Sequence, residues 1–130
     1  MDPELRERVV LLVEDDPAVR SLARRYLRQA GYAVVEAGDG LQAWTRFHRR
    51  PDRFDLLLTD VVMPKMPGTD LAARVHELRP ELPVLLMTGY TQSDLLARGL
   101  QATHGKLVTK PFQGEALVAA VRAALEERQD

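Results

Sequence analysis

The sequence predicts an α/β fold, in which a doubly wound sheet of five parallel strands carries helices on both faces. Five short apolar runs recur along the 130-residue chain. They are apolar on both faces, as in strands of a parallel sheet that is covered on each side. Segments with the three- and four-residue spacing of an amphipathic helix follow these runs. Strand and helix thus alternate five times, which is typical of doubly wound domains.

The predicted elements are bounded by local signals. The first helix has the clearest ones, with Asp16 as its N-cap, Pro17 at its first position and Gly31 at its end. The last helix is marked by apolar residues between 117 and 125. The predicted strands are 8–14, 32–37, 54–60, 82–88 and 106–109, and the helices between the second and fifth strands are 39–50, 69–79 and 91–101.

The strand ends carry the residues of chemical interest. In doubly wound folds, functional residues gather beyond the carboxyl ends of the strands, where the strand order reverses. The flavodoxin-like order 2-1-3-4-5 puts this reversal between the first and third strands. Those strands end in Glu14-Asp15-Asp16 and in Asp60, so their carboxylates are expected to converge.

Length and composition exclude several classes of protein. The chain fits one domain, expected at 8–127, with a linker or cloning remnant at 1–7 and a tail at 128–130. A net charge of −1 argues against a nucleic-acid interface. The absence of cysteine excludes disulfides and thiolate metal sites and suits the cytoplasm. The charged N-terminus and the absence of a ~20-residue apolar run predict no signal peptide and no membrane insertion.

Converging carboxylates require a cation, because burying them unpaired costs on the order of several kcal/mol each. Mg²⁺ suits carboxylate, carbonyl and water ligands, and the strand ends carry neither His nor Cys for zinc. A carboxylate beside Mg²⁺ can attack phosphorus. Phosphoryl transfer then needs mainly positioning and charge neutralisation. Thr88 and Lys110, at the ends of the fourth and fifth strands, supply a hydroxyl and an ammonium for that purpose.

Each of these residues also has a purely structural explanation. An acidic triplet before a proline-started helix is commonly an N-cap with solvated neighbours, and an aspartate after a strand is commonly a turn residue. The histidines His48, His76 and His104 lack the spacing of metal ligands and are predicted to lie at the surface. The coincidence of two acidic ends, a hydroxyl and an ammonium at the same edge favours a functional site.

Four segments, in this order, resemble the receiver domain of bacterial two-component response regulators: VLLVEDDPAVR, LLLTDVVMPKMPG, LLMTGY and VTKPF. The resemblance spans about residues 8–127. It implies a domain that takes a phosphoryl group from the phosphohistidine of a histidine kinase or phosphotransfer protein. It also implies that the domain then signals to a downstream protein partner or a fused domain. A stand-alone regulator and the receiver of a hybrid histidine kinase both fit.

The resemblance also implies a role for each site residue. Asp60 is the expected phosphoacceptor, and Thr88 and Lys110 are expected to contact the phosphoryl oxygens. Asp16 remains chiefly a helix cap, and the Lys110–Pro111 bond is expected to be cis. The expected Mg²⁺ ligands are Asp15 directly, Glu14 through a bound water, Asp60, and the backbone carbonyl of Val62.

Three alternatives remain open. The family often carries an aromatic residue where this chain has Leu107, so a docking module with weak or no phospho-switching is one of them. An aspartyl-phosphate phosphatase is another, although Val62 stands where such enzymes carry a second acid. A flavodoxin-like cofactor binder is the third, although the acids at 14–16 would repel a phosphate and no glycine-rich phosphate loop occurs.

Overall fold

The computed structural model describes residues 7–100 and 105–128. It contains a five-stranded parallel sheet in the order β2-β1-β3-β4-β5, as predicted. Each pair of neighbouring strands runs parallel. The strands are β1 (Val9–Val13), β2 (Ala33–Ala37), β3 (Leu56–Asp60), β4 (Val84–Thr88) and β5 (Lys106–Thr109).

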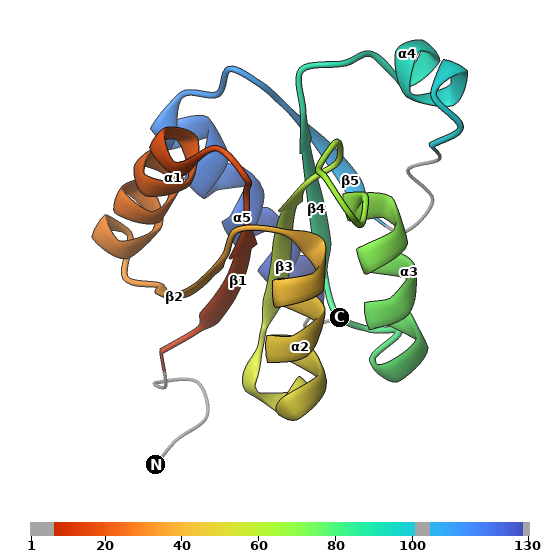
Figure 1. Cartoon of the computed structure of the whole chain (residues 1–130). Coiled ribbons are helices and arrows are strands. Elements are labelled where there is room, and N and C mark those ends of the chain that lie inside the picture. Colours follow the sequence, from red (N-terminus) through yellow and green to blue (C-terminus); the bar gives the residue numbers. More distant parts are fainter. Residues whose placement is uncertain (1–6, 101–104, 129–130) are drawn as a thin grey trace.

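Helices cover both faces of the sheet (Figure 1). One apolar cluster joins the sheet to α1 and α5, and a second joins it to α2, α3 and the single buried residue of α4, Leu95. The five helices are α1 (Pro17–Gln29), α2 (Gly40–Arg49), α3 (Gly68–Leu78), α4 (Gln92–Ala97) and α5 (Gly114–Arg128), and a short 3-10 turn, η2 (Pro51–Arg53), precedes β3.

The helix ends show where prediction and structure agree and where they differ. The Asp16 carboxylate accepts from the amides of Ala18 and Val19 and so caps α1 as predicted, and Gly31 follows the helix with φ +98°. The helix predicted at 91–101 is shorter, because α4 ends at Ala97 and Gly99 adopts a left-handed φ of +76°.

The outermost predictions fall largely outside the described residues. Of the linker expected at 1–7, only Glu7 is described, and of the tail expected at 128–130, only Arg128, which belongs to α5. His104 also lies outside the described ranges. Within residues 7–100 and 105–128, no helix combines the length and apolar character needed to cross a membrane.

Strands β3 and β4 are buried along their whole length, which explains their uninterrupted apolar sequences. The register aligns the strand ends, since Val13 lies opposite Thr59 and Asp60 lies opposite Met87. Glu14 directly follows Val13, the last residue of β1, and Asp60 is the last residue of β3. The sheet therefore brings the acidic ends of β1 and β3 to the same edge.

The loop between β3 and α3 folds back onto the strand that precedes it. The Gly68 amide donates to the Val61 carbonyl at 2.8 Å, and Lys65 turns the chain with φ +73°. A Cβ on Gly68 would overlap the Asp60 carbonyl oxygen and lie 2.9 Å from the Asp60 carbonyl carbon. Glycine at position 68 thus lets the loop pack directly on the backbone of Asp60.

We expect Gly68→Ala to lower the free energy of unfolding by about 1–3 kcal/mol, because the added methyl group meets backbone that has nowhere to move. Urea denaturation measures this change. Gly89→Ala is the matched control, since a Cβ there would meet nothing within 4 Å, and it should change stability by less than about 0.5 kcal/mol. Equal stabilities for the two variants would contradict the packing role of Gly68.

Candidate functional site

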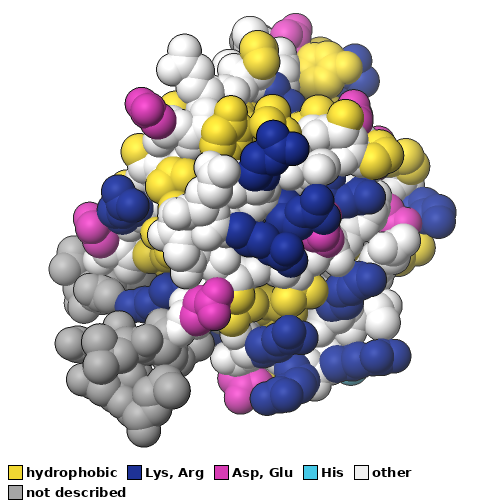
Figure 2. All heavy atoms as spheres, turned by 90° about the vertical axis from the view of Figure 1, so that its left-hand side faces the viewer, with side chains coloured by type: hydrophobic (Ala, Val, Ile, Leu, Met, Phe, Trp, Pro, Cys, Tyr) yellow, Lys and Arg dark blue, Asp and Glu magenta, His cyan; other side chains and the backbone are white. Residues whose placement is uncertain are grey.

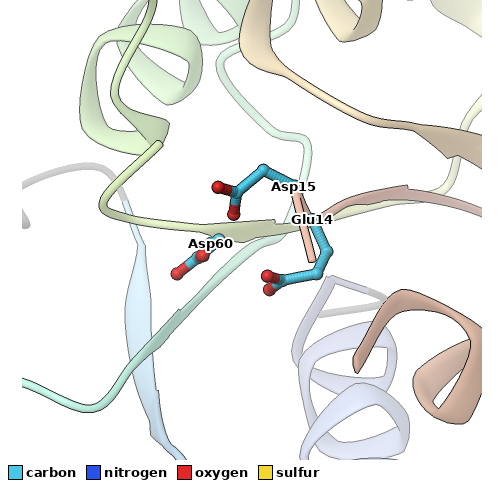
Figure 3. Close-up of side chains that lie close together, drawn as sticks. All are labelled: Glu14, Asp15 and Asp60. Carbon is cyan, nitrogen blue, oxygen red and sulfur yellow. The ribbon is translucent and has the colours of Figure 1, made fainter. Parts of the chain in front are cut away.

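Three carboxylates meet at the carboxyl edge of the sheet, as the sequence predicted. Glu14, Asp15 and Asp60 each offer an oxygen within 4.8 Å of the others. Figure 3 shows Glu14 and Asp15, from the end of β1, turned toward the same space as Asp60 at the end of β3. Glu14 and Asp60 are buried, at 1% and 8% exposure, whereas Asp15 is exposed.

Lys110 is the cation that contacts this cluster. Its Nζ lies 2.7 Å from Glu14 Oε2 and 3.2 Å from Asp60 Oδ2. Burial lowers the pKa of the ammonium, but the hydrogen bond to Glu14 and the charge of Asp60 outweigh it, so the pKa of Lys110 is raised above 10.5. The side chain therefore stays charged and holds two of the three carboxylates.

One ammonium does not neutralise three carboxylates. Burial and the neighbouring charge of Glu14 raise the pKa of Asp60 from 3.8 to about 7, although Lys110 opposes this shift. A divalent cation would supply the missing positive charge and favour ionised Asp60. The donors are all oxygens, which fits Mg²⁺.

The two acids of the β1–α1 loop have different surroundings. Glu14 uses both carboxylate oxygens, because Oε1 accepts from the Asp16 amide at 3.2 Å and Oε2 accepts from Lys110. The Asp15 carboxylate has no hydrogen bond or ion pair with the residues that the structure describes. Asp15 is thus the acid with oxygens left for direct metal ligation, whereas Glu14 is better suited to act through a water.

Thr88 and Val62 lie at the same edge. Thr88 is 3% exposed and directly follows Met87, the register partner of Asp60. Its Oγ1 accepts from the Tyr90 amide at 3.0 Å. The half-buried Val62 side chain packs against the core cluster on the α2–α3 side. The backbone of Val62 is therefore the part of this residue that can serve the site.

A groove of about 380 Å³ opens beside Lys110, and the Lys110–Pro111 bond in its wall is cis, as expected. Apolar side chains dominate its lining, and Leu22 of α1 is 39% exposed there. The residues that line it are Val19, Leu22, Gly89, Lys110, Pro111 and Phe112. An apolar surface thus borders the acidic cluster.

Sequence reasoning missed Arg20. Its Nη1 donates to the backbone carbonyl of Glu14 at 2.8 Å, and its Nε lies 3.5 Å from Glu36 Oε1. No motif marks an arginine in the first turns of a helix as part of a site on the preceding loop. Only the fold of α1 against β1 and β2 reveals this contact.

Comparisons with known proteins agree on one family. The sequence profile of the response regulator receiver domain matches residues 10–122. The chain is 36% identical over 116 residues to the response regulator receiver protein CpdR of Brucella abortus, covering 89% of this chain and 95% of CpdR. It is 38% identical over 116 residues to the transcriptional regulatory protein CseB of Streptomyces coelicolor, covering 89% of this chain and 48% of CseB.

Solved structures show the same fold. The receiver domain of the hybrid histidine kinase CckA matches with a TM-score of 0.77 at 33% identity, over 90% of this chain and 98% of that domain. The chemotaxis protein CheY4 of Vibrio cholerae matches with a TM-score of 0.81 at 28% identity, over 92% of this chain and 99% of CheY4.

The raised pKa of Asp60 predicts how stability depends on pH without metal. Between its usual pKa of 3.8 and its folded value of about 7, the folded state keeps a proton that the unfolded state has lost. The free energy of unfolding then falls as pH rises, with no loss from this group below about pH 4 and the full loss above about pH 7.

Asp60→Asn removes this ionisation, so we expect it to stabilise the chelator-treated protein more at pH 8 than at pH 5. Urea denaturation at both pH values measures the difference. Asp70→Asn, an exposed change in the first turn of α3, should give a difference that does not depend on pH. An equal effect of Asp60→Asn at pH 5 and pH 8 would contradict the raised pKa.

Proposed function

The chain belongs to the response regulator receiver domain family, and on this premise we propose that Asp60 is its phosphoacceptor. The phosphoryl group comes from the phosphohistidine of a histidine kinase or phosphotransfer protein. A carboxylate oxygen of Asp60 forms the new bond to phosphorus, the bond from phosphorus to the donor imidazole breaks, and the imidazole takes up a proton. The observation that carries this proposal is the convergence of Glu14, Asp15 and Lys110 on Asp60.

Asp15, Asp60 and the Val62 carbonyl are the proposed direct ligands of Mg²⁺, with Glu14 acting through water. When bound, the ion neutralises charge on the carboxylates and on the phosphoryl oxygens. Lys110 is already placed beside Asp60, at 3.2 Å, to pair with a phosphoryl oxygen. The ion pair between Glu14 Oε2 and Lys110 Nζ, at 2.7 Å, keeps that ammonium at the site before the phosphoryl group arrives.

Thr88 is the proposed sensor of the phosphoryl group. Its hydroxyl oxygen accepts from the Tyr90 amide, so a hydroxyl that turns to the phosphoryl group changes the β4–α4 loop. Leu107 of β5 is half-buried against the core cluster on the α2–α3 side. Leucine fills less space than an aromatic residue and has no polar group, so we expect a smaller response in β5 than in relatives with an aromatic residue there.

The output lies with another protein or another domain. The chain spans about half the length of CseB and 13% of the sensor kinase CckA of Brucella abortus, to which it is 35% identical over 120 residues. CseB is a transcriptional regulatory protein, and for this chain we propose only that the output requires a separate partner or domain. We assign the domain to the cytoplasm and regard it as a phosphoacceptor rather than a turnover enzyme.

Wild-type protein mixed with acetyl phosphate and Mg²⁺ should gain one phosphoryl group in intact-mass spectrometry. Asp60→Asn should gain none, because the accepting oxygen is lost, and excess chelator should block uptake by the wild type. Asp70→Asn is the control for loss of an exposed carboxylate and should behave as the wild type. A mass gain that persists in Asp60→Asn would remove Asp60 from this role, and steady phosphate release would favour a phosphatase.

The apolar groove beside Lys110 suits the phosphodonor, since a protein docked there lies next to Asp60. Leu22→Glu should slow phosphotransfer about 10-fold or more, because a charge replaces an exposed apolar side chain that lines the groove. Uptake from acetyl phosphate, which needs no docking, should be unaffected. The measurement uses the radiolabelled histidine kinase that phosphorylates the wild type fastest.

Leu41→Glu provides the matched control for this prediction. Leu41 is 47% exposed on α2 and does not line the groove. It should leave both reactions unchanged. Equal effects of the two substitutions on transfer from the kinase would show that the groove is not the docking site.

A further inference from the structure

Arg20 joins three elements beside the acidic cluster. From α1, it reaches the backbone carbonyl of Glu14 after β1 and the carboxylate of Glu36 in β2. Figure 2 looks onto the side of the molecule that carries α1 and β2, and shows Lys and Arg side chains gathered over its centre. Arg20, Arg24 and Arg46 each contact Glu36, and of these three only Arg20 also contacts the backbone of the β1–α1 loop within the described chain.

The contact fixes one peptide plane. The Glu14 amide donates to the Ala37 carbonyl of β2 at 3.2 Å, and the Glu14 carbonyl accepts from Arg20 Nη1 at 2.8 Å. The Glu14 carbonyl belongs to the same planar unit as the Asp15 amide and Asp15 Cα. Holding that carbonyl therefore limits how far the Asp15 backbone, and with it the Asp15 side chain, can reorient.

The charge of Arg20 is partly offset by Glu36, which it shares with Arg24. Glu36 Oε1 lies 3.5 Å from Arg20 Nε, and Glu36 Oε2 accepts from Arg24 Nη1 at 2.9 Å. An unbalanced cation near three carboxylates would weaken the binding of a divalent ion. The pairing with Glu36 reduces this opposition, so the orientation of the Glu14–Asp15 peptide is the main contribution that Arg20 makes to the site.

We propose that Arg20 is a positioning residue for the metal site, which orients Asp15 toward Mg²⁺ by holding the Glu14 carbonyl. The proposal rests on the proposed function and adds a residue outside the ligand set. Removal of a group that orients a ligand typically lowers metal affinity about 10- to 100-fold. Because the preceding peptide unit retains the bond from the Glu14 amide to the Ala37 carbonyl, we expect the lower end of that range.

The test is a calorimetric titration of Arg20→Met with Mg²⁺ alone. We expect an affinity about 10-fold weaker than in the wild type, with a thermal midpoint close to the wild type. The direction of the change in Mg²⁺ affinity distinguishes a positioning role from a purely electrostatic one, since loss of electrostatic repulsion by Arg20 would tighten Mg²⁺ binding. Phosphorylation by acetyl phosphate should slow at low Mg²⁺ and recover at saturating Mg²⁺, because Arg20 does not contact Asp60.

Arg24→Met is the matched control. Arg24 lies one turn further along α1, shares Glu36 with Arg20 and does not contact Glu14. It should change Mg²⁺ affinity by less than about 2-fold, within the range of a surface ion pair. An unchanged or tighter affinity in Arg20→Met, or an equal loss in Arg24→Met, would overturn the proposal.

Arg20→Lys keeps the test decisive if Arg20→Met does not fold. A single ammonium retains the charge but cannot reproduce the forked contact with both Glu14 and Glu36, so Mg²⁺ should again bind more weakly. Wild-type affinity in Arg20→Lys would overturn the positioning role. Failure of the wild type itself to bind Mg²⁺ would instead overturn the metal site, and this role with it.

Discussion

The single ammonium of Lys110, shared by Glu14 and Asp60, is the interaction on which the site depends. It joins the end of β5 to the ends of β1 and β3 and contacts two buried carboxylates at 2.7 Å and 3.2 Å. With one cation and three acids, the edge of the sheet remains short of positive charge. Burial, together with the neighbouring charge of Glu14, raises the pKa of Asp60 at this edge. A divalent ion, as proposed, would offset this imbalance.

The surrounding structure holds the acids together against their repulsion. Two fully buried strands give the sheet a rigid centre. Gly68 lets the following loop lie against the Asp60 backbone, and Arg20 fixes the carbonyl of Glu14 from the other side. Each of these contacts acts on backbone rather than on a carboxylate. The site is therefore preorganised by contacts of the scaffold that leave the oxygens of Asp15 available for a ligand.

The elements that follow Thr88 include the least buried strand of the sheet, β5. β4 is buried throughout, whereas β5 has half-buried residues at its middle and exposed residues at both ends, and α4 buries only Leu95. Elements with few buried contacts open at low free-energy cost. A change at Thr88 would therefore act next to α4 and β5, which we expect to open at low free-energy cost. We expect the half-buried Leu107, which has no aromatic ring to reorient, to limit how far β5 contributes to the proposed response.

The sequence by itself determined the alternation of strands and helices and the cap at Asp16, because apolar periodicity and capping are local signals. The strand order and the carboxyl edge as the place of the site followed from the doubly wound fold class that this alternation indicates. The sequence also identified Glu14, Asp15, Asp60, Thr88 and Lys110 as residues at that edge. Only the tertiary structure decided that Lys110 lies closer to Glu14, 96 residues away, than to Asp60. It also decided that Arg20 reaches back to the β1–α1 loop. Both contacts depend on how distant elements pack, and no periodicity along the chain encodes the direction in which a long side chain turns.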